Sequence, residues 1–566
     1  MIQFIKQQKL FFLITCILTI GAFLRFYKLD WGHGLFTHPD EYHIAASVNQ
    51  LSFPTQMHPH FFSYGTVTIY LIYFTQEIVN FLSTTFNSTT TSGQAFQLST
   101  FNSFIIGRFY SALFSTLTII IVYKICRSFM ERRFSYLAAL LVALAPGLIQ
   151  QAHFATPESA LTFFLFGSLL FTIKFLKQNK ILFLVLASVF LGFALGVKIS
   201  SAVFLFVILA GIILKFFRKP FRLILFTITS LAIVIAAFTV VAPYVFLDYH
   251  AFKSNLEYEG GLAIGKIPVF YTRQFIDTLP IIFQAEKIFP YALGPFLFLF
   301  SSAGLIFLVI NFIRKPKIEL IMLVFAFLSL FLTNAFLFAK WTRFLAPTFP
   351  FFAIFAAISL QTFAKKTQRS IYYFLGGVLV FGTVLWTMSF FSIYTNNDIR
   401  ITASRWLEFH AKPGASFLVE GGNTIDLPLS GNFLRISLDL YRLEEDPVTR
   451  ERIIDALDTS DYFLIQSRRV FYNHQRLRNL YPKTSGFYDA LFNGQMGFEQ
   501  IKEFHSYPTL EIGNWPVLRS LGVGGKLEIA DEAAEETWSV FDHPVIRVFK
   551  KTKQLSKENY AKFLGN

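Results

Sequence analysis

Two adjacent carboxylates, Asp40 and Glu41, lie in the stretch LFTHPDEYHIAASV (35–48), which follows the first apolar segment of the chain. Ionisable residues at membrane depth are energetically costly, so a functional site is their default interpretation. A carboxylate in such a place can act as a general base toward a hydroxyl or an amine. Because adjacent residues of a helix point in different directions, we expect the two carboxylates to have different roles.

Three more charged residues, Glu158, Lys198 and Arg343, lie at the ends of apolar segments. Taken singly, Lys198 and Arg343 are better explained as side chains that reach for the water boundary. Taken together, charges of both signs on one side of a membrane indicate a polar cavity. A lysine can hold a phosphate, and an arginine can do so with two parallel hydrogen bonds. A carboxylate base combined with cations suits the transfer of a sugar from a lipid-phosphate carrier, because the leaving group is an anionic phosphate.

Histidines surround the carboxylate pair and raise the alternative of a divalent metal. They are His33, His38, His43, His58 and His60. The sequence contains no HExxH pattern, and histidines in loops at a membrane interface are more often polar caps. No cofactor is therefore firmly predicted, and a divalent metal is kept as an alternative.

The composition identifies an integral membrane protein. Of 566 residues, 54% are hydrophobic and 15% are charged, and phenylalanine alone occurs 73 times. Soluble domains carry about 25% charged residues. The net charge of +15 comes from short basic runs between apolar segments, which is typical of cytoplasmic loops and argues against nucleic-acid binding. The two cysteines, Cys16 and Cys126, form neither a disulfide framework nor a CxxC site.

The apolar segments predict a polytopic helical bundle of about eleven spans, since one span needs roughly 20 apolar residues. The candidate spans are 9–27, 103–123, 135–150, 157–173, 181–196, 200–214, 222–242, 291–313, 318–339, 344–363 and 371–393. The N-terminal stretch resembles a signal peptide but lacks an A-x-A cleavage site, so we interpret it as a retained first span.

Basic residues between these segments predict the orientation. The runs are Lys6 and Lys9; Lys124, Arg127, Arg132 and Arg133; Lys174, Lys177 and Lys180; Lys215, Arg218, Lys219 and Arg222; Arg314, Lys315 and Lys317; and Lys365, Lys366 and Arg369. They fall on every second loop, so they share one side, which the positive-inside rule identifies as the cytoplasm. The N-terminus is then cytoplasmic, and the loop 28–102 faces outward from the cytoplasmic (inner) membrane. A crossing at 61–82 would break this pattern, so we predict that this stretch is interfacial or re-entrant.

Residues 396–566 have shorter apolar runs and more charges than the membrane domain predicted over 1–395. ASRWLEFH and ERIIDALD predict helices, whereas ASFLVE and DYFLIQS predict strands. WSVFDHPVIRVFK is expected to form two strands about an Asp-His-Pro turn. The alternation predicts a small extracytoplasmic α/β domain.

The chain resembles glycosyltransferase family 39, the C-type membrane glycosyltransferases that include protein O-mannosyltransferases and aminoarabinose transferases. The resemblance rests on HPDEYHIAASV, on residues 107–164, on GFALGVKIS and on RFLAPTFPFFAIFAA. The Asp-Glu pair is its most specific part.

The resemblance implies roles for the candidate residues. Asp40 corresponds to the catalytic base, and Glu41 beside it positions or tunes that base. Glu158 falls at a second acidic position that is usually Asp in the family. Lys198 and Arg343 resemble basic positions of the lipid-phosphate cavity. The family often has a Lys-Pro or aromatic-Pro-Pro pattern late in the first external loop, where this chain has MHPHFFSY, so His58 or His60 replaces that phosphate contact.

We therefore predict an inverting glycosyltransferase of the cell envelope that takes a sugar from a polyprenyl-phosphate donor. The acceptor is left open among protein, lipid and glycan. A transporter or lipid flippase with an outer-face polar cavity is the alternative, but the sequence shows no inverted repeat. A scaffold protein is a third reading. Oligosaccharide transfer is disfavoured because a WWDYG-type motif is absent.

Overall fold

The computed structural model describes residues 2–87, 103–314, 317–422, 425–511 and 525–565. The chain divides into two compact units. The helical unit comprises Met1–Asp30, Asp40–Ile267 and Thr278–Thr387, and the C-terminal unit comprises Trp31–Pro39, Pro268–Asp277 and Met388–Asn566. The predicted domain boundary at residue 395 stays a prediction.

Each segment predicted to span the membrane contains a helix. These helices are α1 (Ile2–Phe26), α4 (Ser103–Cys126), α5 (Arg132–Leu144) with α6 (Pro146–Ala152), α7 (Glu158–Gln178), α8 (Ile181–Val197), η1 (Ile199–Phe204) with α9 (Leu205–Phe216), α10 (Pro220–Val241), α15 (Pro295–Arg314), α16 (Ile318–Ala335), α17 (Thr342–Leu345), η3 (Ala346–Thr348) and α18 (Phe349–Lys366), and α19 (Arg369–Thr395). Within the described residues, seven helices are long and apolar enough to cross a membrane, or eight if one bent pair is a single span. The prediction of a multi-pass membrane protein is confirmed.

Other helices of the helical unit connect these segments. They are α2 (Pro39–Asn49), α3 (Thr66–Asn87), α11 (Tyr244–Leu247), α12 (Tyr249–Ala263), α13 (Ile282–Lys287) and α14 (Phe289–Ala292). Among the described helices, α3 is not one of those apolar enough to span, and it carries Gln76 and Glu77. The interfacial position of this stretch stays a prediction.

A proline divides the predicted span 135–150. The α5 and α6 helices meet at a bend of 53°. Pro146 opens α6 and has no backbone N–H to continue the hydrogen bonds of α5. The preceding residue, Ala145, is extended with φ −69° and ψ 115°, as residues before proline prefer.

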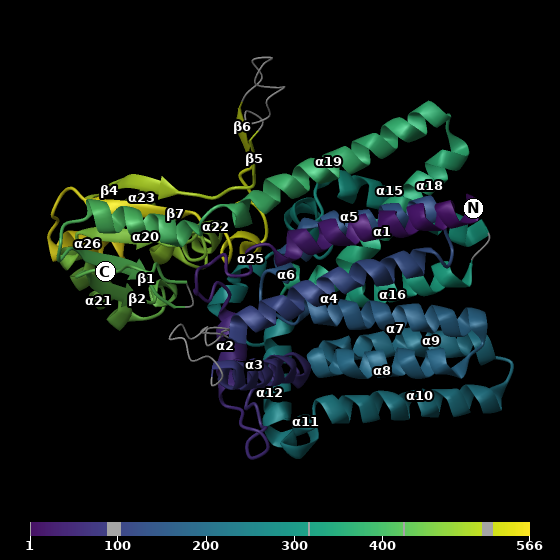
Figure 1. The fold of residues 1–566 in the computed structure, drawn as a ribbon. Coiled ribbons are helices and arrows are strands. Elements are labelled where there is room, and N and C mark those ends of the chain that lie inside the picture. Colours follow the sequence, from purple (N-terminus) through teal and green to yellow (C-terminus); the bar gives the residue numbers. More distant parts are fainter. Residues whose placement is uncertain (1, 88–102, 315–316, 423–424, 512–524, 566) are drawn as a thin grey trace. The chain divides into compact units, whose positions relative to one another are not determined.

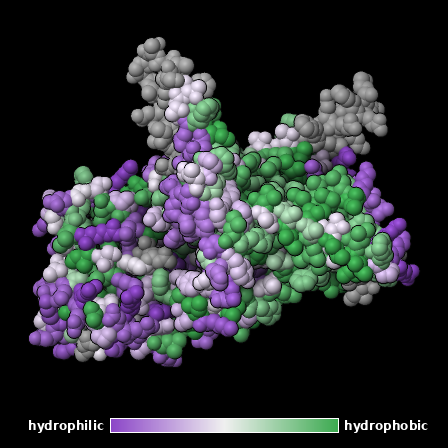
Figure 2. All heavy atoms as spheres, turned by 90° about the horizontal axis from the view of Figure 1, so that it is seen from below, coloured by the Kyte–Doolittle hydropathy of each residue, from purple (hydrophilic) through white to green (hydrophobic). Residues whose placement is uncertain are grey.

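The long helices of the helical unit lie side by side (Figure 1), with α4 packed on α5 and α7, α7 on α8, and α8 on α10. On its outer side α10 exposes large apolar residues, namely Phe221, Ile224, Leu225, Ile228, Ile235 and Val240. Figure 2 shows this face of the unit as a broad hydrophobic surface with a hydrophilic rim at its end. Such a surface is suited to lipid rather than to water.

Four of the predicted basic runs share one end of the helical unit. The loops that join α4 to α5, α7 to α8, α9 to α10 and α18 to α19 lie together there (Figure 1). Because α8 starts at this end, Lys198, which follows its last residue, lies at the other end. Arg343 lies at that other end too, because α18 runs back to the basic end.

The C-terminal unit contains a five-stranded mixed sheet in the order β2-β1-β3-β7-β4. Its strands are β1 (Ser416–Glu420), β2 (Leu434–Leu438), β3 (Tyr462–Ile465), β4 (Phe498–Phe504) and β7 (Ile546–Lys551), and a separate hairpin joins β5 (Thr509–Glu511) to β6 (Lys526–Glu528). β1 is parallel to β2 and β3, whereas β7 is antiparallel to β3 and β4.

Helices cover both faces of this sheet. The helices of the unit are η2 (Phe270–Phe275), α20 (Ile399–His410), η4 (Leu440–Arg442), α21 (Pro447–Thr459), α22 (Phe471–Arg476), α23 (Pro482–Phe492), α25 (Glu536–Ser539) and α26 (Lys557–Phe563). Phe417 and Val419 pack in a core with α20, while Leu418 between them packs in a second core with α21, α23 and α26. This alternation is the period of two expected of a buried strand, and it confirms the small α/β region.

One expectation for this unit is wrong. WSVFDHPVIRVFK was expected to form two strands, but only its second half is a strand, β7. Trp538 lies instead in the short helix α25, and its indole donates to Asp531 at 2.9 Å. His543 is buried between Asp531 and Asp542. A strand would not provide this polar enclosure, so the tertiary hydrogen bonds override the local apolar pattern.

Candidate active site

Asp40 is held in the first turn of α2 by two donors from distant segments. Its carboxylate accepts hydrogen bonds from the hydroxyl of Tyr64 and from Nη1 of Arg343. Arg343 Nη1 also lies 3.1 Å from the Tyr64 hydroxyl oxygen. The side chains of Asp40 and Arg343 are 18% and 20% exposed. The Asp40 carboxylate is therefore oriented by the protein and still partly exposed to solvent.

Tyr64 remains a donor in this arrangement. Burial raises the pKa of the Tyr64 phenol well above its usual value. The nearby positive charge of Arg343 works against this, while the negative charge of Asp40 adds to it. The phenol is therefore protonated at neutral pH, and its O–H can hold the Asp40 carboxylate.

Lys198 and Glu158 form a second ion pair beside the first. Lys198 Nζ donates to Glu158 Oε1 at 3.2 Å. The same ammonium lies 4.6 Å from the ring centre of Phe344 and 5.5 Å from that of Tyr64. Tyr64 contacts both pairs, and Phe344 is the neighbour of Arg343. Four of the predicted site residues are thereby brought together at one end of the helical unit.

A close backbone contact places Tyr64 beside Lys198. The N–H of Gly65 donates to the carbonyl of Val197 at 2.8 Å. A Cβ atom on Gly65 would lie 2.0 Å from the carbonyl oxygen of Gly196, which no side chain can tolerate. Glycine at position 65 therefore permits the start of α3 to touch the end of α8.

Two polar atoms of this cluster are buried without a hydrogen-bond partner. They are Oε2 of Glu158 and Nε of Arg343. Buried polar groups are almost always hydrogen-bonded, and an unsatisfied one costs about 1–3 kcal/mol. An unused acceptor and an unused donor in one cluster are what a ligand with hydroxyl and phosphate groups would satisfy.

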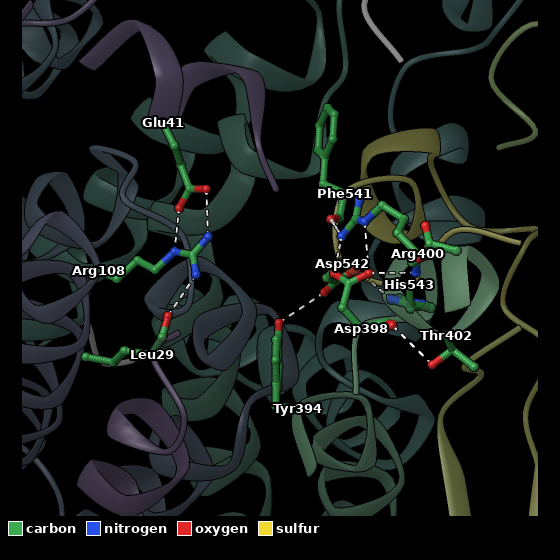
Figure 3. A network of polar contacts seen from close by, with 11 residues as sticks. Leu29, Glu41, Arg108, Tyr394, Asp398, Arg400, Thr402, Phe541, Asp542 and His543 are labelled. Atoms are coloured by element: carbon green, nitrogen blue, oxygen red, sulfur yellow. Dashed lines mark hydrogen bonds and ion pairs between the residues drawn. The ribbon is translucent and has the colours of Figure 1, made fainter. Parts of the chain in front are cut away.

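Glu41 is fully buried, and its carboxylate points toward Arg108 (Figure 3). Its Oε1 accepts from Arg108 Nε at 2.7 Å and from the N–H of Ala155 at 2.8 Å, and its Oε2 accepts from Arg108 Nη2 at 2.8 Å. Arg108 Nη1 donates to the carbonyl of Leu29 at 2.8 Å. The two adjacent carboxylates therefore have different surroundings, since one is accessible and the other ties α2 to α4 and to the turn before α7.

His58 and His60 make contacts of their own. His58 Nε2 lies 3.1 Å from Asp248 Oδ2, and His58 Nδ1 accepts from the N–H of His60 at 2.9 Å. The His60 ring lies 2.9 Å from Gln56 Nε2. Among the described residues, no group of three or more His, Cys, Asp or Glu side chains is arranged to hold a metal ion.

Two residues of this arrangement, Tyr64 and Arg108, were not singled out from the sequence. Arg108 had a readable signal, because it is an arginine inside the apolar segment 103–123 and such residues are rarely without function. Its partner Glu41 lies 67 positions away, and nothing in one sequence joins them. Tyr64 had no signal, since it is one of 23 tyrosines in the chain.

Solved structures define the class of this fold. The archaeal oligosaccharyltransferase AglB from Archaeoglobus fulgidus, in complex with an inhibitory peptide and a dolichol-phosphate, matches with a TM-score of 0.53 and 12% identity, over 85% of this chain and 72% of that chain. The Archaeoglobus fulgidus oligosaccharyltransferase tethered with an acceptor peptide matches with a TM-score of 0.51 and 13% identity, over 97% and 89% of the two chains. The chain has the C-type glycosyltransferase fold, as predicted.

ArnT from Cupriavidus metallidurans bound to undecaprenyl phosphate gives a TM-score of 0.48 at 12% identity, over 94% of this chain and 97% of that chain. This score is too low to support a shared fold by itself.

The sequence comparison is more specific over part of the chain. The profile of the dolichyl-phosphate-mannose-protein mannosyltransferase family matches residues 94–246. This segment contains Arg108, Glu158 and Lys198. The predicted resemblance to glycosyltransferase family 39 is confirmed. No curated protein matches the chain at a significant level.

Proposed function

We propose that this protein is a membrane glycosyltransferase that moves a sugar from a polyprenyl-phosphate donor to an acceptor at the outer face of the cytoplasmic membrane. The observation that carries the proposal is the junction of Asp40, Tyr64 and Arg343 beside the Glu158–Lys198 pair. It offers a general base, two cations for a phosphate and unsatisfied buried atoms for a ligand.

Arg343 and Lys198 would bind the donor phosphate. The buried Nε of Arg343 has no partner in the protein, so it can donate to a phosphate oxygen without breaking an existing bond. An ammonium group has three N–H donors, so Lys198 can contact the same phosphate while it keeps its bond to Glu158 Oε1. The donor phosphate is a diester with one negative charge, and the polyprenyl phosphate that leaves is a monoester with a second one, so a guanidinium and an ammonium together match the charge of the leaving group.

Donor binding would also activate the base. Arg343 Nη1 donates to Asp40, and a carboxylate paired with a cation is a weaker base. A phosphate competes for the same guanidinium, and its arrival weakens the hold on Asp40. The base is then at its strongest when the donor is in place, which limits unproductive turnover.

The chemical step follows from these positions. Asp40 takes the proton of the acceptor O–H or N–H, and the acceptor oxygen or nitrogen forms a bond to the anomeric carbon. The bond between that carbon and the phosphate oxygen breaks, and the electron pair leaves with the phosphate. A single displacement of this kind inverts the anomeric configuration. Arg343 and Lys198 stabilise the added negative charge of the polyprenyl phosphate.

The neighbouring residues take supporting roles in this proposal. The free Oε2 of Glu158 would accept a hydrogen bond from a hydroxyl of the acceptor or of the donor sugar. Glu41 would position Asp40 through its bonds to Arg108 and Ala155. His58 is engaged by Asp248, so we assign it, with His60, to the conformation of the first loop in preference to phosphate contact.

The outer-face assignment rests on charge. The basic loops lie at one end of the helical unit and the candidate site lies at the other. If the basic end is cytoplasmic, then the site, the N-terminus and residues 396–566 take the orientation predicted above, with the N-terminus inside and the last segment outside.

The test is turnover by the purified protein in nanodiscs. A panel of polyprenyl-phosphate sugars is supplied with membrane extract as a source of acceptors, and release of polyprenyl phosphate is followed by mass spectrometry. We expect one donor to be consumed by the wild type and not by Arg343→Gln. If no donor is consumed, and none binds when binding is measured directly, the proposal is wrong.

A further inference from the structure

A further carboxylate, Glu259, lies close to the candidate site and has no role in the reaction proposed above. It belongs to α12, which is part of the helical unit together with the candidate site. Figure 1 shows α12 at the same end of that unit as α2, which carries Asp40. The contacts of α12 decide what Glu259 can reach.

Two contacts attach α12 to the segment just before α3. The ring of Phe252 packs on that of Phe62, with ring centres 6.0 Å apart. About one turn further along α12, the amide of Asn255 donates to the hydroxyl of Ser63 at 3.4 Å. Residues four positions apart share a face of a helix, so Glu259 lies on the same face as Asn255, in the next turn.

The end of α12 is attached to the segment that carries Arg343. The N–H of Ala339 donates to the carbonyl of Ala263 at 3.1 Å, and Ala339 lies four residues before Arg343. Glu259 is therefore one turn after the contact with the first segment and one turn before the contact with the second. Its carboxylate is close enough to Arg343 to interact with the charge of the guanidinium, as the carboxylates of the candidate site do.

The Glu259 carboxylate is available to a ligand. The residue is partly buried, and no residue in the described part of the chain forms a hydrogen bond or an ion pair with it. Glu257 lies on the opposite face of α12. It differs in both respects, since its side chain is 69% exposed and pairs with Lys253 at 3.8 Å. A partly buried carboxylate beside a substrate site is suited to accept hydrogen bonds from that substrate.

We propose that Glu259 binds hydroxyl groups of the donor sugar, an inference that rests on the function proposed above. Arg343 would hold the donor phosphate, and the sugar is joined to that phosphate, so the sugar would lie beside a carboxylate that interacts with Arg343. A carboxylate repels the phosphate itself but accepts hydrogen bonds from neutral hydroxyls. The contact would therefore select donors by their sugar and not by their lipid.

The experiment measures donor binding without turnover. The full chain in nanodiscs carries Asp40→Asn, and two lipids are titrated separately. One is the polyprenyl-phosphate sugar that the wild type consumes, and the other is polyprenyl phosphate without a sugar. Adding Glu259→Gln keeps the shape of the side chain and removes its charge, so the affinity for the sugar-bearing donor should fall about tenfold, as expected for loss of a charge-assisted hydrogen bond. The affinity for polyprenyl phosphate should not fall, because that lipid has no sugar.

The matched control is Glu257→Gln in the same background. It removes the same charge from the opposite face of α12 and should leave both affinities unchanged. A variant that only damages the structure would weaken the binding of both lipids. The comparison between the two lipids therefore separates recognition of the sugar from a structural role.

Three results would overturn the inference. They are an unchanged donor affinity in Glu259→Gln, an equal fall in the affinities for both lipids, and an equal loss of donor affinity in Glu257→Gln. The first result, combined with slower turnover when Glu259→Gln is made in the wild type, would assign the carboxylate to the acceptor. If the wild type neither consumes nor binds any donor, the proposed function fails and this inference fails with it. Failure of the inference alone leaves turnover by the wild type intact.

Discussion

The Glu41→Gln substitution tests how the first carboxylate is positioned by the second. Glu41 and Arg108 both have fully buried side chains, and the Glu41 carboxylate accepts hydrogen bonds from Arg108 and from the N–H of Ala155. Glutamine has nearly the same shape but no charge, and its NH₂ group would face an N–H donor of Arg108. The substitution therefore leaves a guanidinium buried without its counterion.

The size of the effect follows from that geometry. Removing one partner of a buried ion pair costs about 3–5 kcal/mol. Because the glutamine oxygen can still accept from Ala155 or from Arg108 Nε, we expect the lower end of this range, about 3 kcal/mol. The double variant Glu41→Gln with Arg108→Met removes both charges. It should cost less than the sum of the single variants by roughly 1–3 kcal/mol, since the two residues act as one pair.

The assay has two readouts. Unfolding in mixed micelles gives the stability, and release of polyprenyl phosphate per folded molecule gives the turnover. Glu41→Gln should lose stability and turnover together, because a loosened α2 misplaces Asp40. Wild-type stability with no turnover would refute the reasoning, since Glu41 would then act on the substrate itself. Strict additivity in the double variant would refute the pairing.

Three further predictions follow from single contacts. Tyr64→Phe removes the O–H that holds Asp40 and should lower turnover about tenfold. The control Tyr70→Phe loses only a bond to the Met57 carbonyl and should leave turnover unchanged. Equal effects of the two variants on turnover would contradict the role of Tyr64. Arg343→Lys keeps the charge but loses the planar fork, so the KM for donor should rise about tenfold, and an unchanged KM would exclude Arg343 from the phosphate site. Burial lowers the pKa of His543, but Asp531 and Asp542 raise it, with a net result of about 10. The stability that charged His543 contributes is then complete below its usual pKa of 6.5 and is lost as pH rises to about 10. Between these pH values the melting temperature should fall less steeply with pH for His543→Gln than for wild type. An equal slope for the two proteins would contradict the raised pKa of His543.

The sequence was sufficient to predict secondary structure where the local pattern of apolar residues decides it. Apolar runs of membrane length and alternating patterns in the last third of the chain predict the helices and the α/β region that the structure contains. Pro146 is also visible in the sequence and predicts a break in a helix, but the span predicted over 135–150 was continuous. The two strands expected at 538–550 failed because hydrogen bonds from Trp538 and His543 to Asp531, not hydropathy, set the local backbone.

The candidate site was predictable by residue type but not by pairing. Charge at the ends of apolar segments pointed to Asp40, Glu158, Lys198 and Arg343. Which of the two adjacent carboxylates stays accessible depends on Arg108, which lies in another helix and binds Glu41 in a buried ion pair. Such a partner becomes visible only when the chain is folded.

The most direct test of the central claim compares wild type with Asp40→Asn, which keeps the shape of the side chain and removes the base. For the donor that the wild type consumes, donor binding and polyprenyl-phosphate release are measured on the same preparations. The account predicts that Asp40→Asn binds donor at least as well as wild type, because Arg343 is freed for the phosphate, and releases at least about 100-fold less polyprenyl phosphate, as expected for loss of a general base. Release at a rate near that of the wild type would contradict it, since the base would then lie elsewhere.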